Sequence, residues 1–320
     1  MSRTPNAAPE SPPPAARRRI SFRRGTMMAC VALLVVVSGV AARHWLFGDN
    51  PTPVELPKVS IGNPPADPEP TIIEEPAVHG DATDQHPLDP ALKIARDGLD
   101  YLHQDVADYT AVMVKREMVK GTLTGPDRMQ MKVRSRKKKD DELLTPLSVY
   151  LKFETTSAGR EVIWVEDQND GKLIVNEPSV SGLIGRLALP PDGFLAMQGQ
   201  RYPIYNIGFE FLVEELIRFG KRDRERGECE VQINENAEVE GRPCTMIEVR
   251  HPVQRPHFEF HIATIFIDRE LHVPIRFASY SWPTDEGGEP VLLEEYTYLD
   301  VKLNVGLTDA DFDPDEYGFP

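Results

Sequence analysis

Hydrophobic and polar residues alternate with a period of two over most of the chain after Tyr109. Met129, Met131 and Val133 alternate with charged or amide side chains, the pattern of a half-buried β-strand. Similar patterns predict about ten strands, most of them antiparallel: one running from Tyr109, in which Val112, Val114 and Met118 alternate with Met113, Lys115 and Glu117, and others at Arg128–Arg134, Leu147–Phe153, Val162–Val165, Leu173–Asn176, Cys229–Val239, Pro243–Val253, Phe258–Ile267, Val273–Tyr280 and Val291–Val301. The turn Asn169-Asp170-Gly171 suits a tight connection between two of them.

Helical spacing occurs at two places. Asp89 followed by Pro90 predicts a helix start, with apolar residues then recurring at Ala91, Ala95, Leu99, Leu102 and Val106. A second amphipathic helix is predicted over Ile207, Phe211, Leu212, Leu216 and Phe219, ending near Gly220. The elements together predict an α+β fold with a large curved antiparallel sheet and covering helices.

An apolar segment interrupts the strand pattern between Gly182 and Phe219. The ordinary interpretation is a loop and helix that cover the core, which an open sheet needs on one face. The functional interpretation is a lid over a concave apolar sheet on which a lipid chain could lie. The candidate ligand contacts are Leu183, Leu187, Leu195, Tyr202, Tyr205, Phe211 and Phe219.

The N-terminal region predicts export. Residues 25–47 contain an uncharged stretch from Gly25 to Ala42, preceded by the five arginines of Arg17–Arg24. Because positive charge stays in the cytoplasm, we expect a single-pass inner-membrane anchor with residues 1–24 as a basic cytoplasmic tail and the remainder in the periplasm. The small residues Val40-Ala41-Ala42 leave a cleavable signal peptide open as an alternative.

Residues 48–87 contain nine prolines and few large apolar residues, which predicts an extended, disordered spacer before a domain at residues 88–320. The formal net charge of the chain is −15. After Phe47 it contains 29 basic and 50 acidic residues, so nucleic acid binding by the folded part is not expected.

No catalytic residue, cofactor or metal site is predicted. His257 and His261 are too far apart along a strand to share a metal, so these histidines and His251 are predicted on the solvent face. A hairpin turn at Glu240-Gly241 places Cys244 opposite Ala237, far from Cys229, although a turn nearer Asn236 would allow a disulfide between the two cysteines.

The charged run Arg134–Lys139 predicts a solvated hairpin tip. The chain has no phosphate-binding glycine loop, nucleophile elbow or C-x-x-C motif. A hydrolase that uses two of the many carboxylates remains an open alternative, because one sequence cannot show which of them meet.

Several short motifs resemble a bacterial domain-of-unknown-function family over nearly all of Leu88–Phe319. They are the ending Glu294–Asp309 with Phe312, and the pieces Pro190-Pro191-Asp192-Gly193, Arg201-Tyr202-Pro203-Ile204, Gly241-Arg242-Pro243-Cys244 and Tyr280-Ser281-Trp282-Pro283. A weaker similarity to the LolA/LolB/RseB superfamily of periplasmic lipoprotein carriers rests on Ile163-Trp164, Lys172–Val175, Asp268-Arg269-Glu270, Asn304, Asp309 and Phe312. This resemblance implies an unclosed antiparallel half-barrel whose apolar concave face binds acyl chains or another hydrophobic ligand.

The expected function is therefore a membrane-tethered, non-catalytic binding module for a hydrophobic ligand such as a lipid or a lipoprotein acyl chain. The alternative is an envelope interaction or sensor domain that binds a partner protein by the surface or edge of its sheet. The sequence identifies neither the ligand nor a protein partner.

Overall fold

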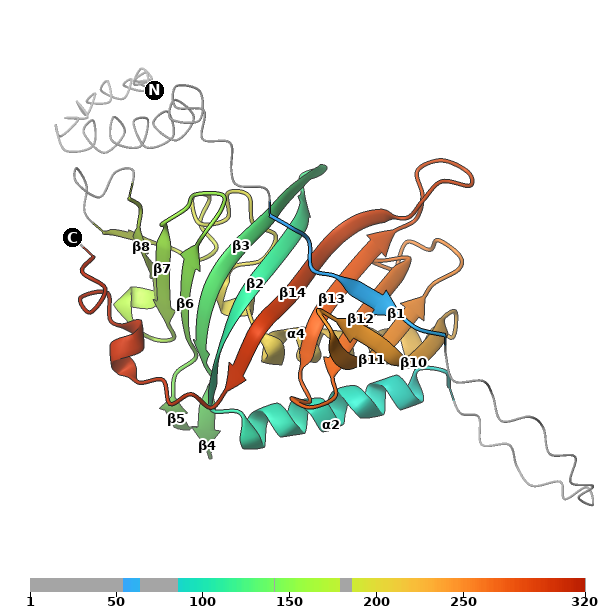
Figure 1. Cartoon of the computed structure of the whole chain (residues 1–320), viewed down its shortest axis with the longest axis horizontal. Helices are drawn as coiled ribbons and strands as arrows, with labels where there is room; N and C mark the ends of the chain where they lie inside the picture. The colour runs from blue at the N-terminus through green and yellow to red at the C-terminus, as the bar shows by residue number, and fades with distance from the viewer. Residues whose placement is uncertain (1–53, 64–85, 141, 179–185, 320) are drawn as a thin grey trace, which may run out of the picture. The chain divides into compact units, whose positions relative to one another are not determined.

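The main sheet consists of twelve antiparallel strands in the described part of the chain (Figure 1). The computed structural model describes residues 54–63, 86–140, 142–178 and 186–319. In spatial order the strands are β1 (Val59–Ile61), β10 (Glu230–Val239), β11 (Arg242–Arg250), β12 (Ile262–Asp268), β13 (Pro274–Ser281), β14 (Val291–Leu303), β2 (Asp108–Val119), β3 (Thr122–Arg134), β6 (Ser148–Phe153), β7 (Glu161–Val165), β8 (Leu173–Asn176) and β9 (Leu187–Leu189). Since β1 and β9 are the two ends of this order, the sheet is unclosed.

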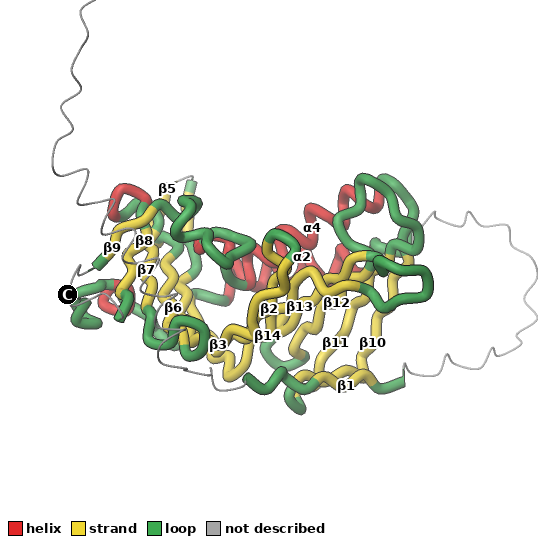
Figure 2. The backbone as a smooth tube through the Cα atoms, turned by 90° about the horizontal axis from the view of Figure 1, so that it is seen from above, coloured by secondary structure: helices red, strands yellow, loops and turns green. Residues whose placement is uncertain are grey.

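Two α-helices lie on one side of the bent sheet (Figure 2). They are α2 (Asp89–Asp105) and α4 (Phe209–Arg224). Short 3-10 helices occur at Asn169–Gly171, Ile204–Asn206 and Asp309–Phe312, and β4 (Lys137–Lys139) pairs with β5 (Glu142–Thr145) in a small separate hairpin. We call the sheet face on which α2 and α4 lie the inner face.

The core lies between the inner face and the helices. Met113 on β2 is the cross-strand neighbour of Met129 on β3 and of Tyr298 on β14, and all three are almost fully buried. Leu102 on α2 and Phe209 on α4 join the same apolar cluster. Alternation along the strands therefore supplies one apolar face to the helices, as the sequence predicted.

The predicted N-terminal tail and membrane segment, residues 1–24 and 25–47, lie outside the described residues. Neither α-helix in the described part of the chain is long and apolar enough to cross a membrane. Part of the range predicted as a spacer pairs with the sheet, because Val59 lies opposite Val239 in the β1–β10 ladder. Its ends are fixed as well: the Lys58 backbone N–H donates to the Glu240 carboxylate at 2.6 Å, and the Asn234 amide donates to the Gly62 carbonyl at 2.8 Å.

The second helix does not end near Gly220 as predicted, but continues to Arg224. Gly220 faces α2, where an added Cβ would come within 2.8 Å of Leu92 Cδ2. The glycine thus allows close packing of the two helices instead of ending one. Asp89 is the first residue of α2 rather than its cap, and its carboxylate pairs with Arg224 at 2.6 Å.

The prediction that His251 lies on the solvent face is wrong. Its side chain is fully buried and stacks on Phe258, with the ring centroids 3.9 Å apart. His251 Nε2 lies 3.3 Å from Asp223 Oδ2 on α4. Since β12 begins only at Ile262, the residues before it are free to turn these aromatic rings inward.

The cysteine geometry agrees with the predicted hairpin. Cys244 lies opposite Ala237 in the β10–β11 ladder, and both Cys229 and Cys244 are free. The predicted solvated hairpin tip at Arg134–Lys139 is confirmed only at its end, where Lys138 and Lys139 are exposed in the β4–β5 hairpin. Arg134 is instead the last residue of β3 with a side chain 13% exposed, and Arg136 pairs with Glu166 at 2.8 Å.

Candidate binding site on the inner face

Residues 186–207 lie between β8 and α4 in the sequence, and we call them the cover segment. They begin with the edge strand β9 and then continue to the polar residues of the inner face described below. Not one residue of this segment is fully buried, whereas the next residues along the chain, Gly208 and Phe209, are. Its apolar contacts with the core are made by partly exposed side chains, namely Leu187, Leu189, Ala196, Ile204 and Ile207. A segment with so little buried surface is held less firmly than the helices beside it.

Beneath the cover segment, the inner face changes from apolar to polar. On β2 the positions facing the helices run from Met113 to Lys115 and Glu117, and on β14 they run from Tyr298 to Tyr296 and Glu294. Tyr296 lies opposite Lys115 and Glu294 lies opposite Glu117 in the ladder. The strand register therefore gathers two acids, a lysine and a tyrosine at one end of the face.

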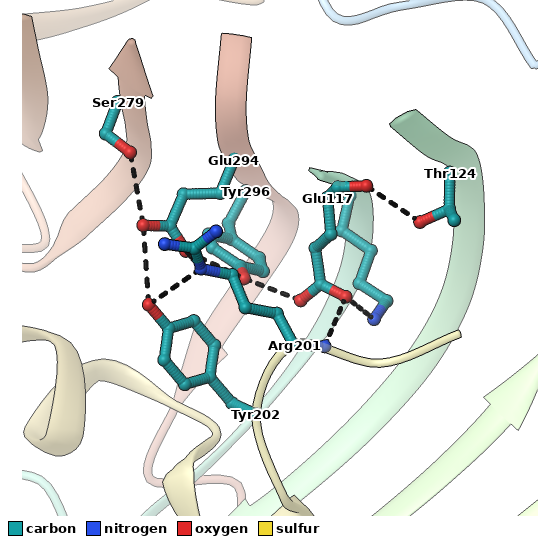
Figure 3. A network of polar contacts seen from close by, with 8 residues as sticks. Glu117, Thr124, Arg201, Tyr202, Ser279, Glu294 and Tyr296 are labelled. Carbon is teal, nitrogen blue, oxygen red and sulfur yellow. Dashed lines mark hydrogen bonds and ion pairs between the residues drawn. The ribbon is translucent and has the colours of Figure 1, made fainter. Parts of the chain in front are cut away.

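These polar side chains of the sheet form hydrogen bonds with one another (Figure 3). Lys115 Nζ donates to Glu117 Oε2 at 2.9 Å, and the Tyr296 hydroxyl lies 2.6 Å from Glu117 Oε1 and 3.2 Å from Glu294 Oε2. Ser279 on β13 donates to Glu294 Oε1 at 3.1 Å. The tyrosine thus bridges two carboxylates whose side chains are only 3% and 8% exposed.

Three consecutive residues of the cover segment complete this network. Gln200 Oε1 accepts a hydrogen bond from Lys115 Nζ at 2.5 Å, and the Arg201 backbone N–H donates to Glu117 Oε2 at 3.2 Å. The Arg201 guanidinium lies 3.2 Å from Glu294 Oε2, and the Tyr202 hydroxyl lies 3.4 Å from Glu294 Oε1 (Figure 3). These contacts fasten the cover segment to β2 and β14, and we call the eight residues named here and above the polar latch: Lys115, Glu117, Gln200, Arg201, Tyr202, Ser279, Glu294 and Tyr296.

Burial governs the ionisation of the polar latch. It raises the pKa of Glu294, and this rise persists although the charge of Arg201 and three hydrogen bonds act in the opposite direction. Burial, followed by the charge of Glu294, raises the pKa of Tyr202 to about 12 and also raises the pKa of Tyr296. The tyrosines are therefore neutral donors at physiological pH.

The predicted ligand-contact residues fall into separate places. Leu183 lies outside the described residues, whereas Leu187 packs against the main core and Leu195 is partly exposed. Tyr202 and Phe211 meet edge to face at 6.1 Å, so these two lie together beside the polar latch. Tyr205 is 38% exposed, and its ring centroid lies 5.9 Å from that of Trp164. Phe219 meets Phe260 edge to face, with the ring centroids 6.5 Å apart.

A family comparison identifies the domain. The family described as "Protein of unknown function (DUF1571)" matches residues 106–319. The chain belongs to this family. No curated protein matches the sequence.

Solved structures with a similar fold share little sequence with this chain. MucB is 13% identical, with 70% of this chain and 62% of that chain covered and a TM-score of 0.41. Lipoprotein LppX of Mycobacterium tuberculosis is 13% identical, with 70% and 100% covered and a TM-score of 0.37. A LolA superfamily protein from Nitrosomonas europaea is 12% identical, with 70% and 98% covered and a TM-score of 0.26. These matches agree with the resemblance that the short motifs indicated, and they concern the fold alone.

Sequence reasoning found Tyr202 but missed Glu294, which accepts its hydrogen bond, and Glu117 beside it. The available signal was the row Met113, Lys115, Glu117, in which charged residues continue an apolar face. A charged pair at inward positions of a strand is costly unless it is satisfied, so it indicates a buried network. The partner across the sheet could not be named, because Tyr296 is 179 residues from Glu117.

Glu294→Gln is expected to reduce the pH dependence of stability. The pKa of Glu294 is raised above its ordinary value of 4.5, so the contribution of this carboxyl to stability is present below about pH 4.5 and is lost as pH rises through the raised pKa. The free energy of unfolding of the wild-type protein, relative to that of the variant, should therefore fall as pH rises from about 4.5 through the raised pKa of Glu294. Urea unfolding at several pH values measures this difference. The exposed Glu289→Gln is the control, and a difference that rises or stays constant with pH would contradict the assignment.

Proposed function

We propose that this domain binds a hydrophobic ligand, such as a lipid or a lipoprotein acyl chain, between the inner face and the cover segment, without catalysis. The carrying observation is the contrast between the two surfaces. The inner face is apolar and deeply buried at Met113, Met129 and Met131, next to the polar residues that the cover segment contacts, whereas residues 186–207 contain no fully buried side chain. The part of the cover segment that follows β9 can move away while the helices and the other strands stay folded.

The polar latch leaves most of the polar groups on the sheet paired when the cover segment opens. When Gln200, Arg201 and Tyr202 withdraw, the sheet still pairs Lys115 with Glu117. Glu294 loses its ion pair with Arg201 but keeps the hydrogen bonds of Tyr296 and Ser279. Opening therefore costs mainly the ion pair between Arg201 and Glu294, and Glu294 then becomes accessible to water.

No step of the proposed function needs the paired carboxylates to react. Glu117 and Glu294 satisfy the short separation that a two-carboxylate hydrolase would need, because Tyr296 bridges them. Both are nevertheless engaged by cations and covered, which suits a structural clasp better than a general acid and base.

We propose that the domain acts on the periplasmic side of the inner membrane, with residues 25–47 as the anchor. Pairing of β1 at Val59 shortens the free connection between anchor and sheet to residues 48–58. Because a chain spans at most about 3.5 Å per residue, the eleven residues from 48 to 58 hold the sheet edge within roughly 40 Å of the membrane segment. The domain would then receive its ligand close to the bilayer.

Binding of a partner protein by the sheet edge is the rival function. Both edge strands, β1 and β9, contain only three residues, and short edges offer few free backbone groups for strand addition. We therefore favour the inner face over the edge as the binding site.

The test uses the full chain purified in mild detergent and a fluorescent long-chain fatty acid. We expect saturable binding that unlabelled phospholipid displaces, and native mass spectrometry should show bound lipid. Arg201→Ala removes the ion pair with Glu294 and should speed association several-fold, while Arg255→Ala, which loses an exposed pair with Glu228 outside the polar latch, should not. If neither the wild-type protein nor the Arg201→Ala variant binds the probe, the proposal is wrong.

A further inference from the structure

Three metal-ligating side chains meet where the two helices approach each other, outside the polar latch. His103 lies in the last turn of α2, and Glu210 lies in the first turn of α4 with Glu214 one turn later. One imidazole nitrogen and one oxygen from each carboxylate all lie within 4.8 Å of one another. The closest pair, His103 Nε2 and Glu210 Oε1, is 3.1 Å apart.

The backbone on both sides of this cluster is held firmly. Lys137 Nζ donates to the carbonyls of His103 and Val106 at 2.6 and 3.1 Å, which fixes the end of α2. Phe209, the residue before Glu210, is fully buried and stacks on Tyr109 at 4.4 Å. The side chains themselves are partly exposed and free to adjust, so the cluster combines fixed anchor points with adaptable ligands.

The electrostatics of the cluster favour a bound cation. Glu210 and Glu214 are four residues apart on one helix, a spacing at which like charges repel. The charge of Arg136 acts on both glutamates, but its Nε donates to Glu166 at 2.8 and 3.0 Å, and among the described residues the guanidinium makes no hydrogen bond to Glu210 or Glu214.

The donor set indicates the class of ion. Imidazole with two carboxylates suits zinc and other divalent first-row metals, whereas magnesium and calcium prefer oxygen ligands alone. Ligand atoms bound to one zinc at about 2.0–2.2 Å lie roughly 3.3–3.6 Å apart, so closing the cluster needs side-chain shifts of only about 1 Å.

We propose that His103, Glu210 and Glu214 bind one divalent transition-metal ion, which would link α2 to α4 beside the end of the cover segment. The sequence analysis predicted no metal site, because His103 and Glu210 are 107 residues apart and no spacing motif joins them. This site does not depend on ligand binding at the inner face.

The experiment uses the full chain without a polyhistidine tag, stripped of metal by a chelator. Zinc titration by calorimetry should show one high-affinity ion per chain, and cobalt should give visible absorption bands typical of a bound nitrogen and oxygen donor set. His103→Gln and Glu214→Gln should each weaken zinc binding at least about tenfold, since even changes in outer-shell partners weaken metal sites 10–100-fold. Glu215→Gln, a neighbouring carboxylate on the same helix, is the matched control and should leave the affinity unchanged.

Thermal unfolding of the metal-free variants separates loss of binding from loss of folding. Because the substituted side chains are partly exposed, the variants should have unfolding temperatures near that of the metal-free wild-type protein. Failure of the metal-free wild-type protein to bind zinc saturably would overturn the proposal. Equal weakening by Glu215→Gln and Glu214→Gln would overturn it as well, because it would show diffuse attraction to an acidic surface. A cobalt spectrum unchanged by His103→Gln would do the same.

Discussion

Replacing Gly208 with alanine is expected to lower the free energy of unfolding by about 3 kcal/mol, because two costs combine at this position. Gly208 has φ +106°, a conformation that residues with a Cβ rarely adopt. An added Cβ would also lie 2.4 Å from the Tyr109 hydroxyl. That hydroxyl cannot easily move, because Tyr109 is 2% exposed, stacks on Phe209 and accepts the Phe209 backbone N–H at 3.2 Å. Urea denaturation followed by circular dichroism measures the loss.

Gly199→Ala separates the two costs. Gly199 has φ +75° in the cover segment, but no atom lies within 4 Å of its added Cβ, so we expect a loss of only about 1 kcal/mol. In a Tyr109→Phe background, which removes the clashing oxygen, the penalty of Gly208→Ala should shrink. Equal losses for the two glycines would show that the Tyr109 contact does not hold the junction between the cover segment and α4.

The strands could be predicted because their determinants are local. Alternation over Leu173–Asn176 gave the bounds of β8, and Asn169-Asp170-Gly171 makes the expected tight turn with all three residues at positive φ. The Glu240-Gly241 turn likewise set the register that places Cys244 opposite Ala237. Side-chain period and turn chemistry are both encoded within a few residues, so one sequence suffices for them.

Errors arose where a residue serves a distant partner. Glycine is a residue type typical of helix ends, but Gly220 lies inside α4 and allows Leu92 of α2 to pack closely against it. Histidine is a polar residue expected at the surface, but the His251 ring stacks on Phe258 and lies 3.3 Å from the Asp223 carboxylate. Val59 lies in a proline-rich range, yet it pairs with Val239. Local propensity does not contain the contacts of Gly220 with Leu92, of His251 with Asp223 or of Val59 with Val239, since each joins elements that are far apart along the chain.

Only the local part of the candidate site could be predicted from the sequence, because its other residues come from distant strands. The apolar character of the 182–219 segment indicated a cover, and Tyr202 was identified within it. The polar latch depends on Glu117 and Glu294 becoming neighbours through the β14–β2 register. A strand that arrives after 170 or more residues cannot be aligned from periodicity alone, so the sequence analysis identified neither the inward orientation of the two acids nor their partnership.

Glu117→Ala is expected to lower the free energy of unfolding by about 3–5 kcal/mol, the range typical of breaking one side of a buried ion pair. Glu117 accepts hydrogen bonds from Lys115, Tyr296 and the Arg201 backbone, and its side chain is 3% exposed. Its removal leaves the Lys115 ammonium, 7% exposed, without a carboxylate. Chemical denaturation at neutral pH measures the loss.

The matched control is Glu154→Ala, which removes a carboxylate 30% exposed and paired with Arg128 on the solvent side. Because exposed pairs contribute little, this change should cost less than about 1 kcal/mol. The double variant Lys115→Met, Glu117→Gln removes both buried charges while keeping an acceptor for Tyr296, and it should be more stable than Glu117→Ala. If the double variant is no more stable, the loss comes from packing and not from an unpaired buried lysine, and the polar latch then has no role in compensating charge beneath the cover segment.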